Sequence, residues 1–146
     1  MTDWRLEVVV SDEVRSRWDG DPAYPIGADV VDGFVTLADE ALHRGQVEAA
    51  AVLGWTAAEA ALRLLAQENN VVLEDLSPSL LVRQLFSEGW LDRTQCQALM
   101  EILEQRNRIV HGLRASSESE TERVEVQQIL TVSREILAGT TQKGRK

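Results

Sequence analysis

Apolar and polar positions alternate in the first residues of the chain. In WRLEVVV, Trp4, Leu6, Val8 and Val10 recur with the period of two that predicts a half-buried β-strand. The following WDGDPAYPIG holds two prolines and two glycines, which predict a loop. We therefore expect residues 1–28 to form a strand and loop extension that precedes the main domain.

The apolar period becomes helical after residue 28. Gly45 predicts the end of the first helix, whose core face is formed by Val30, Phe34, Leu37 and Leu42. The next segment, QVEAAAVLGWTAAEAALRLLAQENN, is rich in helix formers and apolar on nearly all sides, as is typical of a central helix. Asn69 and Asn70 predict its end.

Capping signals place three more helices. Ser77 as N-cap, Pro78 at the first helical position and Gly89 just past the end predict a short helix. Asp92 and Gln95 form a capping-box pattern for a helix running toward His111 and Gly112. A second such pattern, Ser119 with Glu122, precedes a helix with the apolar residues Val126, Ile129, Leu130, Ile136 and Leu137.

These elements predict an all-α fold, an antiparallel bundle of four or five helices over residues 29–139. We expect residues 140–146, which include the basic QKGRK, to be a disordered tail. The 146 residues, 44% of them hydrophobic, suit one domain with one core. Fifteen Lys and Arg against 24 Asp and Glu give a net charge of −9, so any phosphate binding must be local or shared with another chain.

The residue counts also bound the chemistry. A single cysteine, Cys96, excludes an internal disulfide, and two histidines make a zinc centre improbable, so we expect no metal and no cofactor. The acidic start MTDWRLEVVV does not resemble a signal peptide, and no apolar run of membrane-spanning length is free of charge. We expect a cytoplasmic protein without a membrane partner.

The stretch EQRNRIVHGL is the main candidate for chemistry. On the helix before Gly112, Arg106 falls in the middle of an apolar stripe made of Leu99, Ile102, Leu103, Val110 and Leu113. Asn107 and His111 share the adjoining face, and Arg108 points further round toward solvent. A guanidinium can hold a phosphate, and an imidazole can exchange a proton with a ribose 2′-hydroxyl or a leaving 5′-oxygen. This set therefore favours phosphodiester cleavage without a metal.

RNRIVH, Arg106 to His111, resembles the signature of the HEPN superfamily of helical domains (higher eukaryotes and prokaryotes nucleotide-binding), an arginine, usually with a polar residue next to it, followed by a histidine. Four residues intervene here, and the polar residue is Asn107. The likeness extends more weakly over Asp29 to Leu137. The N-terminal strand is not part of the family bundle.

The resemblance implies a metal-independent endoribonuclease, a toxin or antiviral defence effector whose site forms across a homodimer. Arg106 would contact the scissile phosphate of an RNA substrate, Asn107 would support the site and His111 would be the acid or base. An antitoxin or a larger defence protein would be its partner. The family also includes inactive binding modules.

Each site residue also has a purely structural interpretation. His111 suits a helix C-terminus, because a histidine there interacts favourably with the negative end of the helix dipole. Arg106 needs a partner if it is buried, and we expect Glu59 of the central helix to supply the carboxylate and to support the site. The alternative function is a catalytically silent helical binding module of a larger defence or regulatory system, whose edge strand at Trp4 to Val10 pairs with another chain.

Overall fold

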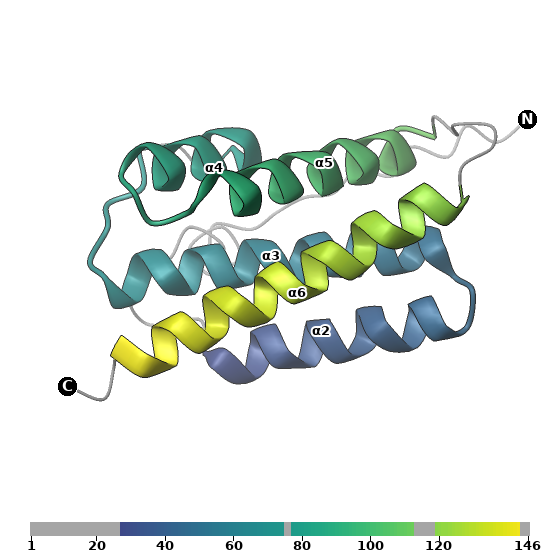
Figure 1. Cartoon of the computed structure of the whole chain (residues 1–146), viewed down its shortest axis with the longest axis horizontal. Coiled ribbons are helices and arrows are strands. Elements are labelled where there is room, and N and C mark those ends of the chain that lie inside the picture. The colour runs from purple at the N-terminus through teal and green to yellow at the C-terminus, as the bar shows by residue number, and fades with distance from the viewer. Residues whose placement is uncertain (1–26, 75–76, 113–118, 144–146) are drawn as a thin grey trace, which may run out of the picture.

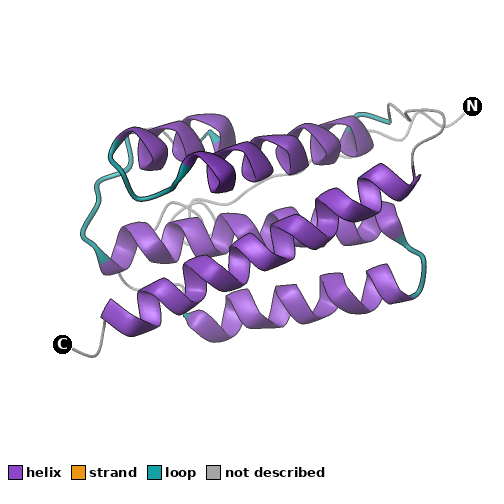
Figure 2. Cartoon of the chain, viewed as in Figure 1, coloured by secondary structure: helices purple, strands orange, loops and turns teal. Residues whose placement is uncertain are grey.

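The computed structural model describes residues 27–74, 77–112 and 119–143, which form five α-helices. They are α2 (Ala28–His43), α3 (Val47–Glu68), α4 (Pro78–Ser87), α5 (Arg93–Val110) and α6 (Ser119–Lys143). Within these ranges the chain is helix, turn or loop and holds no strand (Figure 2). The predicted strand at Trp4 to Val10 and the loop after it lie outside the described residues.

The helices form an antiparallel bundle around α3 (Figure 1). Among the described elements, α3 contacts all four other helices, while α2 contacts only α3 and α6. α5 packs against α3, α4 and α6. This arrangement confirms the all-helical bundle and the central position of the alanine-rich helix.

Small residues allow α3 to take that central position. Its buried positions are mostly alanines and leucines, with the large Trp55 also buried. A Cβ atom on Gly54 would lie 3.1 Å from Cγ2 of Ile129, so the glycine permits the close approach of α6. α3 is long and apolar enough to cross a membrane by length and composition alone, but 67% of its apolar window is buried inside the protein, as a core helix requires.

Three of the four residues predicted for the core face of the first helix lie one position away from it, whereas Leu42 is buried as predicted. Val30 and Leu37 are 42% and 48% exposed and Phe34 is half-buried, whereas the core side is formed by Val31, Val35, Ala38, Ala41 and Leu42. The cause is that α2 packs against two helices, α3 and α6, so its buried side includes Ala38 and Ala41, small residues that a search for large apolar side chains does not select.

The helix ends follow the sequence signals closely. Gly45, Gly89 and Gly112 all have positive φ just beyond a helix, and Asn70 does so after α3. α4 begins with Ser77 as N-cap and Pro78 as its first residue. α6 begins at Ser119 and continues to Lys143, so it includes the first four residues of the segment predicted as a tail, and residues 144–146 lie outside the described residues.

Candidate functional site

The candidate motif occupies the last turns of α5, a helix with a well-defined start. The backbone N–H of Gln95 donates to Asp92 Oδ1 at 2.7 Å, and the Gln95 side chain accepts from the Asp92 N–H at 3.1 Å. This is the predicted capping box. At the other end, Val110 is the last helical residue, His111 is the C-cap and Gly112 turns the chain at φ 70°.

Arg106 lies at the border between core and solvent. Its side chain is half-buried, and Nη1 donates a hydrogen bond of 2.9 Å to Oδ1 of Asn107, which is half-buried as well. The predicted apolar stripe is buried only from Leu99 to Leu103, since Val110 is 54% exposed. Leu113 lies outside the described residues. The guanidinium therefore lies where the buried part of this stripe ends, between the buried Leu103 and the exposed Val110.

The polar residue that α5 does bury is Gln105. Its side chain is fully buried, and neither the Nε2 nor the Oε1 atom has a hydrogen-bond partner. A buried amide without hydrogen-bond partners lowers the stability of the fold, because its loss of water is not offset by any new hydrogen bond. Gln105 was not predicted to be buried, because the predicted apolar stripe has the width that covers one neighbouring helix. In the structure α5 contacts α3, α4 and α6, so its buried side is wider and extends from Leu103 round to Gln105.

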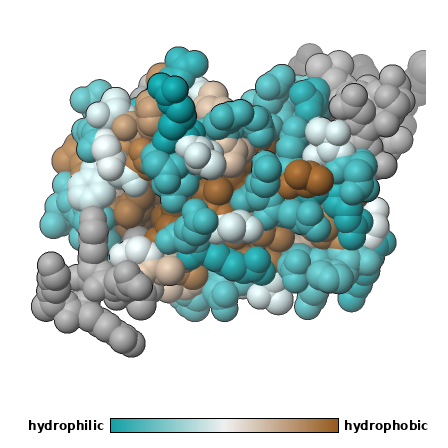
Figure 3. Space-filling view, viewed as in Figure 1, coloured by the Kyte–Doolittle hydropathy of each residue, from teal (hydrophilic) through white to brown (hydrophobic). Residues whose placement is uncertain are grey.

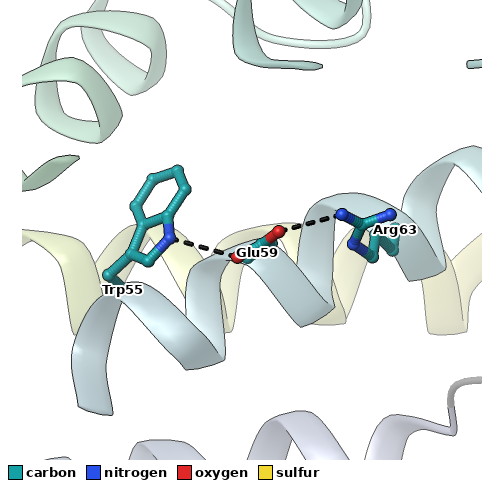
Figure 4. A network of polar contacts seen from close by, with 3 residues as sticks. All are labelled: Trp55, Glu59 and Arg63. Atoms are coloured by element: carbon teal, nitrogen blue, oxygen red, sulfur yellow. Dashed lines mark hydrogen bonds and ion pairs between the residues drawn. The ribbon is translucent and has the colours of Figure 1, made fainter. Parts of the chain in front are cut away.

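The predicted pair between Glu59 and Arg106 is wrong. Glu59 Oε1 accepts from Arg63 Nη2 at 2.9 Å, and its Oε2 accepts from Nε1 of the buried Trp55 at 3.1 Å. The three residues are spaced by four along one side of α3, so the carboxylate bonds within its own helix (Figure 4). Periodicity places this carboxylate among apolar residues but does not show which cation reaches it, and the i,i+4 partner is the nearer one.

His111 is exposed at the C-terminal cap of α5. Its backbone N–H donates to the carbonyl of Asn107 at 3.0 Å, whereas its imidazole makes no hydrogen bond or ion pair with any described residue. At about 100° per residue, Asn107 and His111 lie one turn apart on one side of the helix. Within one chain, therefore, Arg106 and Asn107 are joined and His111 stands beside them with its ring free.

Carboxylates surround the outer side of the motif. Arg108 Nη1 contacts Glu104 Oε1 at 3.3 Å, so Arg108 is paired and not simply directed into solvent. From α6, Glu125 faces the same group, and one of its oxygens is buried without a hydrogen-bond partner. Burial first, and then the nearby charge of Glu101, raise the pKa of Glu125, while Arg108 acts against this. Glu122 and Glu104 add smaller contributions in the raising direction.

A groove of about 680 Å³ lies between the first half of α5 and the facing part of α6. Hydrophilic side chains dominate the face seen in Figure 3, with apolar ones visible between them. The groove is lined from α5 and its cap by Asp92, Thr94, Gln95, Gln97, Ala98 and Glu101, and from α6 by Val124, Gln127, Gln128, Thr131, Val132 and Glu135. None of the motif residues Arg106, Asn107 and His111 lines it.

No group of three or more potential ligand side chains that could hold a metal ion occurs among the described residues. The arrangement at the end of α5 offers a cation and a titratable ring, a combination suited to anion binding and proton transfer. Comparisons of the chain with models of protein families, with curated proteins and with solved structures gave no match.

Proposed function

We propose that the chain is a HEPN-like, metal-independent endoribonuclease that acts as a homodimer, with the end of α5 as its site. Arg106 holds the scissile phosphate, Asn107 fixes the guanidinium and His111 acts as general acid or base. An enzyme of this kind serves as a toxin or antiviral effector and is held in check by a partner. Attack by the 2′-hydroxyl on the neighbouring phosphorus forms a 2′,3′-cyclic phosphate and expels the 5′-oxygen, which leaves with a proton.

The observation that carries this proposal is the state of Arg106. Asn107 holds its guanidinium at 2.9 Å, yet Arg106 forms no ion pair with any carboxylate in the described part of a chain that bears a net charge of −9. A half-buried guanidinium that is held by a neutral amide is not neutralised by a carboxylate, so its charge can attract an external anion. Had Arg106 been neutralised by Glu59, the structural interpretation would be preferred.

The exposed end of the α5 stripe supports a dimer. Val110 is 54% exposed and Ile109 is half-buried, although both continue the apolar side of the helix. A two-fold contact at this end would cover them and bring two arginines and two histidines into one cleft. The local positive charge would then exceed what a single chain presents to RNA.

The acidic seam beside the motif favours a second candidate, the silent binding module. The charges of Glu101, Glu104 and Glu122 all act on Glu125, with Arg108 as the one cation that opposes them, and these four carboxylates repel a phosphate backbone. Such a surface suits a protein partner better than a long RNA. The two functions differ in a single measurable property, which is RNA cleavage that depends on His111.

The test is cleavage of single-stranded RNA by the purified chain in excess chelator. We expect products with a 2′,3′-cyclic phosphate and a 5′-hydroxyl, and no cleavage of DNA, because DNA lacks the attacking oxygen. His111→Ala should lower the rate by about 10²-fold or more. His43→Ala is the matched control, since His43 is the other histidine and lies exposed in the last turn of α2.

Equal rates for wild type and His111→Ala would contradict the proposal and identify the activity as a contaminant. A wild-type protein that cuts no transfer, messenger or structured RNA would favour the silent module. A rate lost equally in His43→Ala and His111→Ala would show that the effect is not specific to the motif.

A further inference from the structure

The groove between α5 and α6 carries negative charge that the described protein does not neutralise. Asp92, Glu101 and Glu135 line it, and its lining contains no lysine, arginine or histidine. None of the three forms an ion pair with a described residue. Asp92 accepts from the backbone N–H of Gln95, Glu135 from the side-chain amide of Gln95, and Glu101 from the side-chain amide of Gln97.

The charges sit at the two ends of the groove. Asp92 caps α5 and Glu135 lies near it, because Gln95 Nε2 donates to Glu135 Oε2 at 3.3 Å while Gln95 also bonds Asp92. Glu101 lies nine residues further along α5, which corresponds to about 13 Å of helix. Glu125 lies near Glu101 at that second end, and its pKa is raised by burial first and then by the charge of Glu101.

Between the ends, the groove offers neutral polar groups over a small apolar floor. The side chains of Thr94, Gln127 and Gln128 make no hydrogen bond with other residues in the described ranges. Ala98 and Val132 lie beneath them. Amides and hydroxyls of this kind can bond both the N–H and the C=O groups of an extended peptide.

We infer that this groove binds a basic, extended peptide segment of a partner protein. An extended chain advances about 3.3 Å per residue, so cations four residues apart span about 13 Å and reach the acidic groups at both ends. Ion pairs between the cations of the segment and the carboxylates at the two ends of the groove fix its register, and the side-chain amides of Gln127 and Gln128 bond its backbone. The site is separate from Arg106 and His111, so this inference does not rest on the proposed ribonuclease activity.

The test uses a seven-residue peptide with arginines at its second and sixth positions and alanine or serine elsewhere, titrated into the full chain by calorimetry or fluorescence anisotropy. Wild type should bind it, and affinity should fall as salt rises. Glu101→Gln combined with Glu135→Gln should weaken binding about tenfold, as expected for two exposed ion pairs. The control pair is Asp32→Asn with Glu40→Gln, which removes the same charge from the exposed side of α2 and should leave affinity unchanged.

Several outcomes would overturn the inference. Equal weakening by both double variants would mean that only net charge matters, as would equal binding of a peptide with adjacent arginines. Spermine binding as tightly as the peptide would assign the groove to small polyamines. Self-association that disappears in the Glu101→Gln, Glu135→Gln variant would assign it to a second copy of the chain. Unfolding curves of each variant in urea check that the fold is retained.

Discussion

Polar side chains enter the bundle at two places, the middle of α3 and the second half of α5, and their surroundings differ. On α3, Glu59 bonds both Trp55 and Arg63, so donor and acceptor satisfy each other within one helix. On α5, Gln105 is buried without a partner and Arg106 has only a neutral amide. The polar group on α3 has hydrogen-bond partners within the chain, whereas on α5 the amide of Gln105 has no partner and the guanidinium of Arg106 has no carboxylate partner.

Under the proposed function, this difference separates a structural role of Glu59 from a functional role of Arg106. A paired network in the centre of a bundle contributes to stability and has nothing left for a ligand. Unpaired polar groups near a helix end reduce stability, and such costs are concentrated at functional sites. The comparison therefore predicts that apolar substitutions of Glu59 on α3 and of Gln105 on α5 change the free energy of unfolding in opposite directions.

The largest stability change is expected on α3. Glu59→Ala leaves the indole N–H of the buried Trp55 without an acceptor and removes the Arg63 pair, so the free energy of unfolding should fall by about 1–2 kcal/mol. The control is Glu104→Ala, which breaks an i,i+4 pair with Arg108 whose carboxylate is 74% exposed and should cost less than about 0.5 kcal/mol. Equal losses in urea unfolding would show that the Trp55 bond contributes nothing.

A gain is expected at Gln105. Gln105→Met replaces a buried unpaired amide by an apolar side chain of similar length, which should raise the free energy of unfolding by about 1 kcal/mol. Gln97→Met, at an exposed position of the same helix, should give no such gain. A loss of stability in Gln105→Met would show that the amide is hydrogen-bonded in solution and would remove the contrast with α3.

The smallest effect, and the one that depends on pH, is expected at Glu125. Its pKa is raised above the ordinary 4.5, so the folded chain binds this proton more tightly than the unfolded chain does. The resulting stability is fully present below pH 4.5 and is lost as the pH rises through the raised pKa. Glu125→Gln should thus stabilise the protein at neutral pH, by less than about 1 kcal/mol, and lose this advantage in acid. A gain of equal size at both pH values would contradict this account of Glu125.

Local signals in the sequence predict the helices well. The Asp92–Gln95 capping box, Pro78 at a helix start and the glycines after three helices each act over a few residues, so their effect does not depend on the rest of the fold. Packing partners are harder to predict. Part of the core side of α2 was missed because this helix is covered by both α3 and α6 and buries Ala38 and Ala41, whose small side chains give a weak apolar signal.

The site could be predicted only in part. The sequence placed the motif at the end of a helix, where α5 does end, but it did not indicate the 2.9 Å hydrogen bond between the side chains of Arg106 and Asn107. Helical periodicity gave Arg106 the wrong depth and gave Glu59 the wrong partner, because both depend on which neighbouring helix covers which turn. Gln105 and the α5–α6 groove require the assembled bundle, so no pattern along the chain indicates them.

The claim that the open end of α5 is a phosphate site can be tested most directly by NMR of the two histidine rings. The chain contains two histidines, His43 and His111, and both lie exposed. One spectrum therefore records the ring signals of His111, at the proposed site, and those of His43 as an internal control. A pyrimidine 3′-nucleotide is titrated into labelled protein, with the signals assigned from a His43→Gln variant. We expect saturable shifts of the His111 ring signals that disappear in Arg106→Ala, with the His43 signals unchanged. Equal shifts of both rings, or no shift of His111 at any concentration, would contradict the assignment of this site.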